Sequence, residues 1–204
     1  MGTLALVVIT AEAIFEGEAA ALNKLFEGGM GTLHLRKPTA SEKELRHLLL
    51  QVNAAFHERI VLHDHFALAG AFRLKGAHLS RRNPVPPPPP INSVSRSCHS
   101  LAELEQIGDF SYVLLSPIFD SISKKGYTQA FAREDLLSAK AKGLLNEKVV
   151  ALGGVSAATI PLAASCGFGG VAVLGALWGD FPKSKDERAL MKRFGELRAA
   201  AQKQ

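Results

Sequence analysis

Two apolar segments that run into glycine carry the clearest chemical signal in the last third of the chain. Residues 148–152 lead into Gly153 and Gly154, and residues 170–174 lead into Gly175. Glycine lets a backbone approach a ligand closely, and the N–H groups that open a following helix attract anions. Alternatively, these glycines only form tight turns between a strand and a helix. The segments start 22 residues apart, which suits one strand, turn and helix, and as a pair they favour a phosphate site.

Polar side chains follow the other apolar segments of the chain. Basic, hydroxyl and histidine groups predominate at 34–37, 63–65, 80–83, 96–99 and 116–125, and Asp64 and Asp120 are the acids that stand out. In a barrel of parallel strands, catalytic groups lie where the strands end. This set of groups suits a phosphate or diphosphate ligand, with a carboxylate available for a divalent cation.

A regular alternation of short and longer segments predicts the scaffold for these groups. Strands are expected at 4–10, 32–36, 60–63, 76–79, 92–95, 112–115, 148–152 and 170–174, and helices at 41–56, 100–106, 133–142, 156–166 and 185–204. Ser41, Ser100 and Ser156 are the expected N-caps of three helices. Nearly apolar strands that alternate with helices indicate a parallel sheet covered by helices. With 204 residues, of which 47% are hydrophobic and 21% charged, the chain fits one α/β domain over residues 1–204, a (β/α)8 TIM barrel.

One helix of this barrel is expected to be missing. Between the fourth and fifth strands the chain has Pro84 and then five prolines at 86–90. Proline lacks the N–H that a helix interior needs. We therefore expect a polyproline II connector in place of the fourth helix, although the run could also serve as an SH3-type ligand.

The charge of the chain indicates which kinds of ligand and partner it can bind. The net charge is +5 and the pI is near 9.3, but Lys and Arg are scattered, and the densest group, at 183–193, has acidic neighbours. That pattern is typical of a solvated helix face. We therefore expect phosphorylated small molecules as ligands and no nucleic-acid partner.

The cysteines and the apolar segments indicate the compartment. Cys98 and Cys166 show no metal-ligand spacing, so we expect buried free thiols in a reducing environment. No apolar stretch approaches the length of a membrane span, and no signal peptide precedes the first strand. We expect a cytoplasmic protein with no membrane partner.

The order and spacing of several short motifs resemble one enzyme family. The motifs are His-Leu-Arg at 34–36, Arg-Ser-Cys-His-Ser at 96–100, Tyr-Val-Leu-Leu-Ser-Pro-Ile-Phe at 112–119, Lys-Lys-Gly at 124–126, Ala-Leu-Gly-Gly-Val at 151–155 and Gly-Val-Ala-Val-Leu-Gly-Ala at 170–176. Over residues 4–180 the chain is similar to the thiamine phosphate synthase and TenI family. The synthase branch implies a (β/α)8 transferase that joins an aminomethylpyrimidine diphosphate to a thiazole phosphate and releases diphosphate with the help of Mg²⁺. The TenI branch implies an isomerase that aromatises a thiazole phosphate.

The resemblance also assigns roles to individual residues. It implies catalytic roles for Arg36, Ser97 and Lys124, of which Arg36 and Lys124 could instead be surface cations. The substrate-binding residues that it implies are His34, Arg36, His63, Ser97, Ser121, Ser123, Lys124, Gly153, Gly154, Leu174 and Gly175. In this assignment the glycines hold the thiazole phosphate, and the cations and serines face the diphosphate.

Asp64 and Asn83 are the Mg²⁺ ligands that the resemblance implies. Asn83 stands where the family has a second acid, so it removes a charge and should weaken the binding of the metal. Asp64 could instead cap the following helix. His63 and His65 flank Asp64 and could share one side of a strand. With no third nitrogen or sulfur ligand at a recognisable spacing, we do not expect zinc.

Departures from the synthase pattern leave the branch of the family open. His34 replaces a glutamine, Pro38 stands where the family has a lysine, and Lys37 would point to the other face of the strand. Pro117 replaces the histidine that moves the proton in TenI, so a tautomerase would need His34 or His63 instead. The leading hypothesis is the synthase. The alternatives are the tautomerase and a non-catalytic binder of thiazole phosphate or thiamine phosphate, and by analogy we expect a homodimer.

Overall fold

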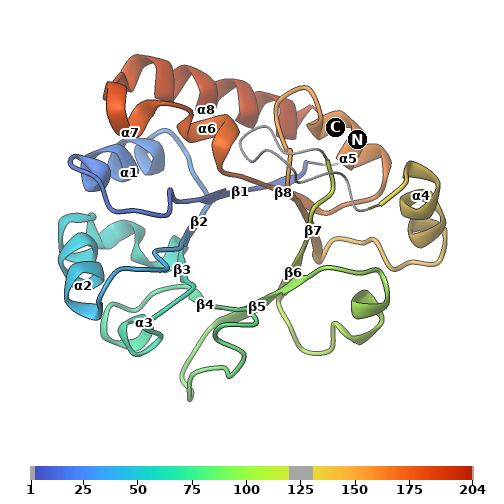
Figure 1. Cartoon of the computed structure of the whole chain (residues 1–204), viewed down its shortest axis with the longest axis horizontal. Helices are drawn as coiled ribbons and strands as arrows, with labels where there is room; N and C mark the ends of the chain where they lie inside the picture. The colour runs from blue at the N-terminus through green and yellow to red at the C-terminus, as the bar shows by residue number, and fades with distance from the viewer. Residues whose placement is uncertain (1–2, 120–130, 204) are drawn as a thin grey trace.

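The computed structural model describes residues 3–119 and 131–203, and within them eight strands close into a barrel. The strands are β1 (Ala5–Ile9), β2 (Thr32–Leu35), β3 (Ile60–Leu62), β4 (Gly76–Leu79), β5 (Ser93–Cys98), β6 (Tyr112–Leu115), β7 (Val149–Leu152) and β8 (Gly170–Val173). Figure 1 looks down the barrel, with the strands in a ring and the helices outside it. Each strand is parallel to its neighbours, and β8 pairs with β1 to close the ring. The predicted (β/α)8 fold is confirmed.

Helices cover the outside of the ring (Figure 1). They are α1 (Glu18–Glu27), α2 (Glu42–Gln51), α3 (Ala67–Ala71), α4 (Arg133–Ala141), α5 (Ile160–Ser165), α6 (Gly175–Trp178), α7 (Phe181–Ser184) and α8 (Glu187–Gln202), with two 3-10 helices, η1 (Ala54–Arg59) and η2 (Ala102–Gln106). Among the described residues, no helix is long and apolar enough to cross a membrane.

Several helix boundaries differ from the predicted ones for local reasons. The helix expected at 41–56 begins as predicted, with Ser41 and Glu44 forming a capping box, but it ends at Gln51 because Val52 is extended. The helix expected at 100–106 is a 3-10 helix over 102–106 whose N-cap is Leu101, so the predicted N-cap at Ser100 is wrong, although the Ser100 hydroxyl accepts from the backbone N–H of Glu103. The last helix begins at Glu187 because the side chain of the preceding aspartate caps it.

The predicted N-cap at Ser156 is wrong. The helix expected at 156–166 begins at Ile160, with Thr159 as its N-cap and Pro161 in its first turn. Residues 156–159 form a turn instead, in which the backbone N–H of Ser156 donates to the Thr159 hydroxyl at 2.9 Å. The hydroxyl that should have capped the helix therefore belongs to a turn ahead of it.

The chain between β4 and β5 contains no helix, as the prolines predicted. Most of residues 80–92 are exposed, and Val85 keeps 72% of its surface. In Figure 1 this connector extends away from the barrel below β4 and β5.

The interior of the barrel is divided into an apolar and a polar part. On one side, a small cluster of apolar side chains comes from β1, β6, β7 and β8: Val7, Ile9, Leu114, Val150 and Ala172. On the other side, from β2 to β5, the buried side chains include His34, His63, His78 and Ser95. Other apolar strand residues, such as Val8, Leu33 and Leu62, belong to the main core. Both predicted free cysteines are buried in that core.

Candidate active site at the carboxyl ends of the strands

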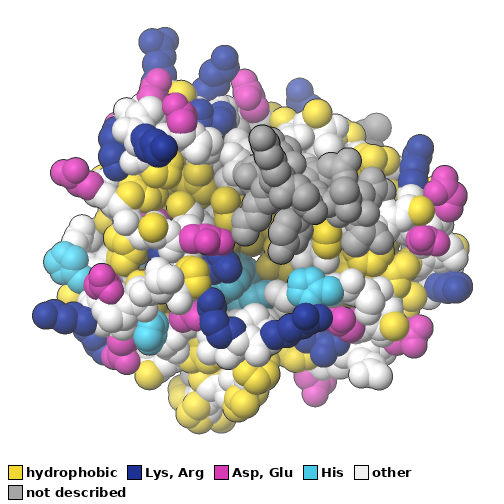
Figure 2. All heavy atoms as spheres, in the orientation of Figure 1, with side chains coloured by type: hydrophobic (Ala, Val, Ile, Leu, Met, Phe, Trp, Pro, Cys, Tyr) yellow, Lys and Arg dark blue, Asp and Glu magenta, His cyan; other side chains and the backbone are white. Residues whose placement is uncertain are grey.

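A cavity of about 360 Å³ opens where β2 to β5 end. Its polar lining includes three arginines and three histidines, namely Arg36, Arg81, Arg82, His63, His78 and His99. Figure 2 shows histidine side chains at the bottom of a hollow in the middle of this face, with Lys or Arg side chains around it. A larger hollow of about 910 Å³ between α1 and α2 contains none of the predicted site residues. The excess of positive charge at the smaller cavity favours an anionic ligand.

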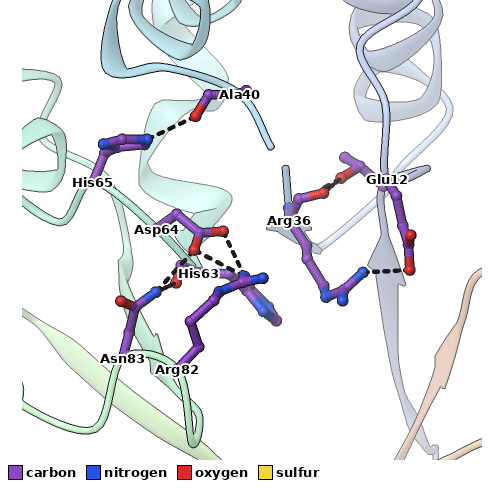
Figure 3. A network of polar contacts seen from close by, with 9 residues as sticks. Glu12, Arg36, Ala40, His63, Asp64, His65, Arg82 and Asn83 are labelled. Atoms are coloured by element: carbon purple, nitrogen blue, oxygen red, sulfur yellow. Dashed lines mark hydrogen bonds and ion pairs between the residues drawn. The ribbon is translucent and has the colours of Figure 1, made fainter. Parts of the chain in front are cut away.

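Consecutive residues at the end of β2 point in opposite directions. Arg36 lines the cavity, and its guanidinium pairs with Glu12 at 2.8 Å (Figure 3). Lys37 is buried on the other side, with its ammonium 2.6 Å from the Glu18 carboxylate and bonded to two backbone carbonyls. Burial raises the pKa of Glu18, and the charge of Lys37 opposes that shift. Lys37 is therefore a structural cation and does not replace the lysine that Pro38 displaces.

The two predicted metal ligands, Asp64 and Asn83, lie side by side after β3 and β4. The Asn83 side-chain nitrogen donates to an Asp64 carboxylate oxygen and to the backbone carbonyl of His63, both at 2.8 Å. Arg82 donates to both oxygens of the same carboxylate at 2.8 and 3.1 Å (Figure 3). Asp64 does not cap the next helix, because the N-cap of α3 is Phe66 and no side chain caps it. The Asp64 carboxylate is thus already paired with an arginine.

Three histidines from neighbouring strands meet inside the barrel. His34 lies in β2, His78 lies in β4, and His63 directly follows β3. Nδ1 of His34 lies 2.9 Å from Nε2 of His63, and the rings of His63 and His78 stack with their centroids 4.3 Å apart. His65 is directed elsewhere, because it has a positive φ of 52° and hydrogen-bonds to the Ala40 carbonyl (Figure 3). The predicted shared side of His63 and His65 is therefore wrong.

Hydroxyl groups surround these three histidines, which we call the histidine cluster. Nε2 of His34 lies 2.6 Å from the Tyr112 hydroxyl. Nδ1 of His78 lies 2.9 Å from the Ser95 hydroxyl, and its Nε2 lies 2.9 Å from the Ser97 hydroxyl. The cluster is therefore held by uncharged partners on β5 and β6.

Burial keeps the histidine cluster uncharged. It lowers the pKa of His78 to about 3, with a smaller contribution from the charge of Arg36. The pKa values of His34 and His63 also lie well below the usual range, first because both rings are buried and then because His78 lies beside them. At pH 7 the three imidazoles are neutral.

Glycines at the ends of β7 and β8 form the opposite side of this face. Gly153 and Gly154 have positive φ angles of 96° and 64°, and Gly175 opens α6. A Cβ on Gly153 would lie 2.9 Å from Cα of Pro117, so only glycine fits the turn. All three glycines are partly exposed, and Leu152, next to the first pair, lines the cavity. This corner therefore adjoins the cavity through Leu152, while the glycines are not among the lining residues.

The structure gathers most of the predicted site residues at one end of the barrel. Arg36, His63 and Ser97 line the cavity, and Asp64 pairs with Arg82 at its edge. Two further predicted positions lie deeper: His34 is fully buried, and Leu174 packs against the apolar cluster inside the barrel. Ser121, Ser123 and Lys124 lie outside the described residues.

The sequence analysis assigned no role to three residues of the site. His78 lies in a strand of four residues, and Tyr112 lies at the start of another. Their direction depends on the register of the barrel, since each strand places alternate residues inside and outside. Arg82 belongs to a basic pair in the connector. No sequence motif comparable to the glycines after the last two strands identifies these three side chains.

Comparison with known proteins identifies relatives along most of the chain. Residues 6–177 match the TMP-TENI family model, described as thiamine monophosphate synthase. A thiamine-phosphate synthase of Desulfitobacterium hafniense is 27% identical over 168 residues, which cover 77% of this chain and 80% of that protein.

Solved structures show the same arrangement of strands. A thiamine phosphate pyrophosphorylase from Bacteroides thetaiotaomicron is 35% identical, with a TM-score of 0.88, covering 97% of this chain and 98% of that one. A thiamine phosphate pyrophosphorylase from Pyrococcus furiosus, at 21% identity and a TM-score of 0.69, shares the fold over 95% of this chain and 96% of that one.

Proposed function

Because the chain belongs to the thiamine monophosphate synthase family, we propose that it joins an aminomethylpyrimidine diphosphate to a thiazole phosphate and releases diphosphate. The observation that carries this proposal is the cavity lined by Arg36, Arg81 and Arg82. Cations fixed where negative charge develops stabilise a transition state more than they stabilise the substrate. The charge that grows in this reaction is on the departing diphosphate.

The two sides of the cavity suit the two substrates. The arginine side suits the diphosphate, because guanidinium groups bind phosphate oxygens through paired N–H donors. The glycine turns after β7 and β8 suit the single phosphate of the thiazole, because they expose backbone rather than side chains. With both partners held, the thiazole nitrogen is positioned to capture the pyrimidine cation as the diphosphate leaves.

The arginines have movable partners that a diphosphate could replace. Arg82 and Arg36 pair with Asp64 and Glu12, and the arginine side chains keep 46% and 31% of their surface. A diphosphate offers more negative charge than either carboxylate, so both guanidinium groups can turn to it without crossing the core. Arg36 and Arg82 then hold the leaving group, and Asp64 is released.

Mg²⁺ fits the pair of Asp64 and Asn83 once Arg82 has turned away. Mg²⁺ typically binds one or two protein carboxylates together with substrate phosphate oxygens. Asp64 supplies such a carboxylate, whereas Asn83 now presents its amide nitrogen to Asp64 and must rotate to offer its oxygen. When bound, the ion would neutralise part of the diphosphate charge. Asp64, and Asn83 after rotation of its amide, are the residues that would hold Mg²⁺ beside the diphosphate.

The tautomerase alternative has weaker support from the histidine cluster. A general base works best when its pKa lies near the working pH. Burial and neighbouring charges hold the pKa values of His34 and His63 well below the usual range, so both are poor proton acceptors at pH 7. Pro117, at the position of the TenI histidine, packs against Gly153 and carries no proton.

An assay of product formation tests the proposal. The purified chain is incubated with both substrates and Mg²⁺, and thiamine phosphate and diphosphate are measured by chromatography. We expect both products in equal amounts. Aromatisation of the thiazole phosphate alone, without the pyrimidine substrate, would identify the tautomerase. Tight binding of the substrates without either product would identify a non-catalytic binder.

A further inference from the structure

The histidine cluster has the composition of a transition-metal site. One nitrogen from each of His34, His63 and His78 lies within 4.8 Å of the other two. The rings come from β2, from the end of β3 and from β4, so the backbone of three adjacent strands fixes their positions. We propose that these three imidazoles bind one divalent transition-metal ion of the zinc class, at a site separate from the Asp64 carboxylate.

The His34–His63 distance is close to what a metal ion needs, and the His78 nitrogen lies within 4.8 Å of both. With Zn–N bonds of 2.0–2.1 Å and tetrahedral angles, two ligand nitrogens lie about 3.4 Å apart. Nδ1 of His34 and Nε2 of His63 are 2.9 Å apart, held by a shared proton. An ion that replaces this proton needs the two rings to separate by a few tenths of an ångström, within the reach of small χ rotations.

The hydrogen bonds around the cluster match those around known metal ligands. A metal-bound histidine usually donates its second N–H to an oxygen, which fixes the ring. His34 has the Tyr112 hydroxyl at 2.6 Å from its other nitrogen. Whichever nitrogen of His78 turns to the ion, the other keeps a serine hydroxyl at 2.9 Å, from Ser95 or Ser97.

The protonation state of the cluster also suits a metal. Imidazole binds a metal only when it is neutral, and binding at low pH must displace protons. Burial holds the pKa of His78 at about 3, so no proton has to leave this ring at pH 7. Three nitrogen donors favour Zn²⁺, Co²⁺ or Ni²⁺ over Mg²⁺, which prefers oxygen.

The histidine cluster lies at the bottom of the cavity, so the fourth coordination position of a bound ion would face the cavity. His63 and His78 line the cavity, while His34 lies behind them. Three protein ligands and one open position are typical of catalytic rather than structural zinc sites. The positive charges of Arg36 and Arg82 make the binding of a cation at this place less favourable. We therefore expect an anionic oxygen from the cavity as the fourth ligand, because it offsets part of that charge.

A titration with Co²⁺ tests this proposal independently of the transfer reaction. The full chain, without a histidine tag, is stripped with a chelator and titrated with Co²⁺ while visible absorption is recorded. We expect the intense absorption of four-coordinate Co²⁺ to saturate at one equivalent and to disappear when Zn²⁺ is added. Mg²⁺ in excess should not displace it. Absence of the band in the wild-type chain overturns the proposal without any variant.

Matched variants locate the ion. His63→Gln should abolish the band, whereas His99→Gln, which removes an exposed histidine of the same cavity, should keep it. Circular dichroism identifies a variant that fails to fold, in which case His34→Gln takes its place. A band that survives the loss of either cluster histidine in a folded variant overturns the proposal.

Thermal unfolding gives a second measurement on the unaltered chain. An ion that binds only the folded state raises the Tm, by roughly 5–10 °C at about 100 times its Kd for a chain of this size. We expect this shift with Zn²⁺ and not with Mg²⁺. Equal shifts with both ions, or none with Zn²⁺, contradict a nitrogen-ligated site.

Discussion

The two sides of the barrel face differ in what they offer a ligand. From β2 to β5, side chains form the site: arginines at the edge of the cavity and neutral histidines below them. At β7 and β8, glycines expose the backbone over an apolar interior. The first side offers charged side chains and imidazole nitrogens, and the glycines of the second offer backbone N–H and C=O groups. Under the proposed function, this difference would direct the diphosphate to the side chains of one side and the monophosphate to the backbone of the other.

The largest effect that we predict concerns a cation outside the cavity. Lys37→Met leaves the Glu18 carboxylate buried without its partner, so the free energy of unfolding should fall by about 3–5 kcal/mol. Urea unfolding measures the change. Lys43→Met, on α2, is the control and should change it by less than about 0.5 kcal/mol. A small decrease in the free energy of unfolding of Lys37→Met would contradict a structural role for the Lys37–Glu18 ion pair.

Removal of a cavity arginine should reduce activity rather than stability. Arg36→Ala takes a guanidinium from the proposed diphosphate side, so kcat/KM for thiamine phosphate formation should fall about 100- to 1000-fold. Arg46→Ala removes an arginine from an exposed ion pair on α2 and should leave kcat/KM unchanged. An Arg36→Ala enzyme as active as the wild type would contradict the binding of the diphosphate on the arginine side of the cavity.

A substitution on the glycine side should affect the binding of the monophosphate. Gly153→Ala forces a side chain into a backbone with φ of 96° and against Pro117, which should cost about 1–3 kcal/mol of stability. The KM for the thiazole phosphate should rise more than the KM for the diphosphate substrate. Gly195→Ala, inside α8 where a Cβ meets nothing within 4 Å, should instead stabilise the chain by about 0.5–1 kcal/mol. Equal effects on both KM values would contradict separate sites.

A further effect concerns the pH dependence of the metal-free chain. The pKa of His78 is about 3 in the folded state and near 6.5 when unfolded, so the unfolded state binds the extra proton between these values. The free energy of unfolding should therefore fall as the pH decreases from 6.5 towards 3, by about 1.4 kcal/mol per pH unit for this group. Urea unfolding of His78→Gln should show a shallower slope. An unchanged slope in His78→Gln would contradict the burial argument.

The sequence predicted the backbone of this protein better than its side-chain contacts. Eight short apolar segments matched the eight strands, because alternation of strand and helix depends on local patterns. The glycine turns and the missing helix were also visible, since glycine and proline act on the backbone directly. The N-cap prediction at Ser156 failed because a serine hydroxyl can form hydrogen bonds within a turn as well as cap a helix.

The histidine cluster could not be recognised from local spacing. His34, His63 and His78 are separated by 29 and 15 residues, and they meet only because parallel strands bring distant segments into register. The sequence does not predict zinc, because no third nitrogen or sulfur ligand lies at a recognisable spacing from His63 and His65, whereas the cluster takes its nitrogens from three different strand regions. A site of this kind requires the closed barrel before its ligands can be identified.

A crystal structure with both substrates, or with a non-reacting analogue of the diphosphate substrate, tests the central claim most directly. The account predicts the thiazole phosphate against the backbone of Gly153, Gly154 and Gly175, and the diphosphate against Arg36 and Arg82. Ligand phosphates on the same side of the cavity, or a glycine corner without any anion, would contradict it.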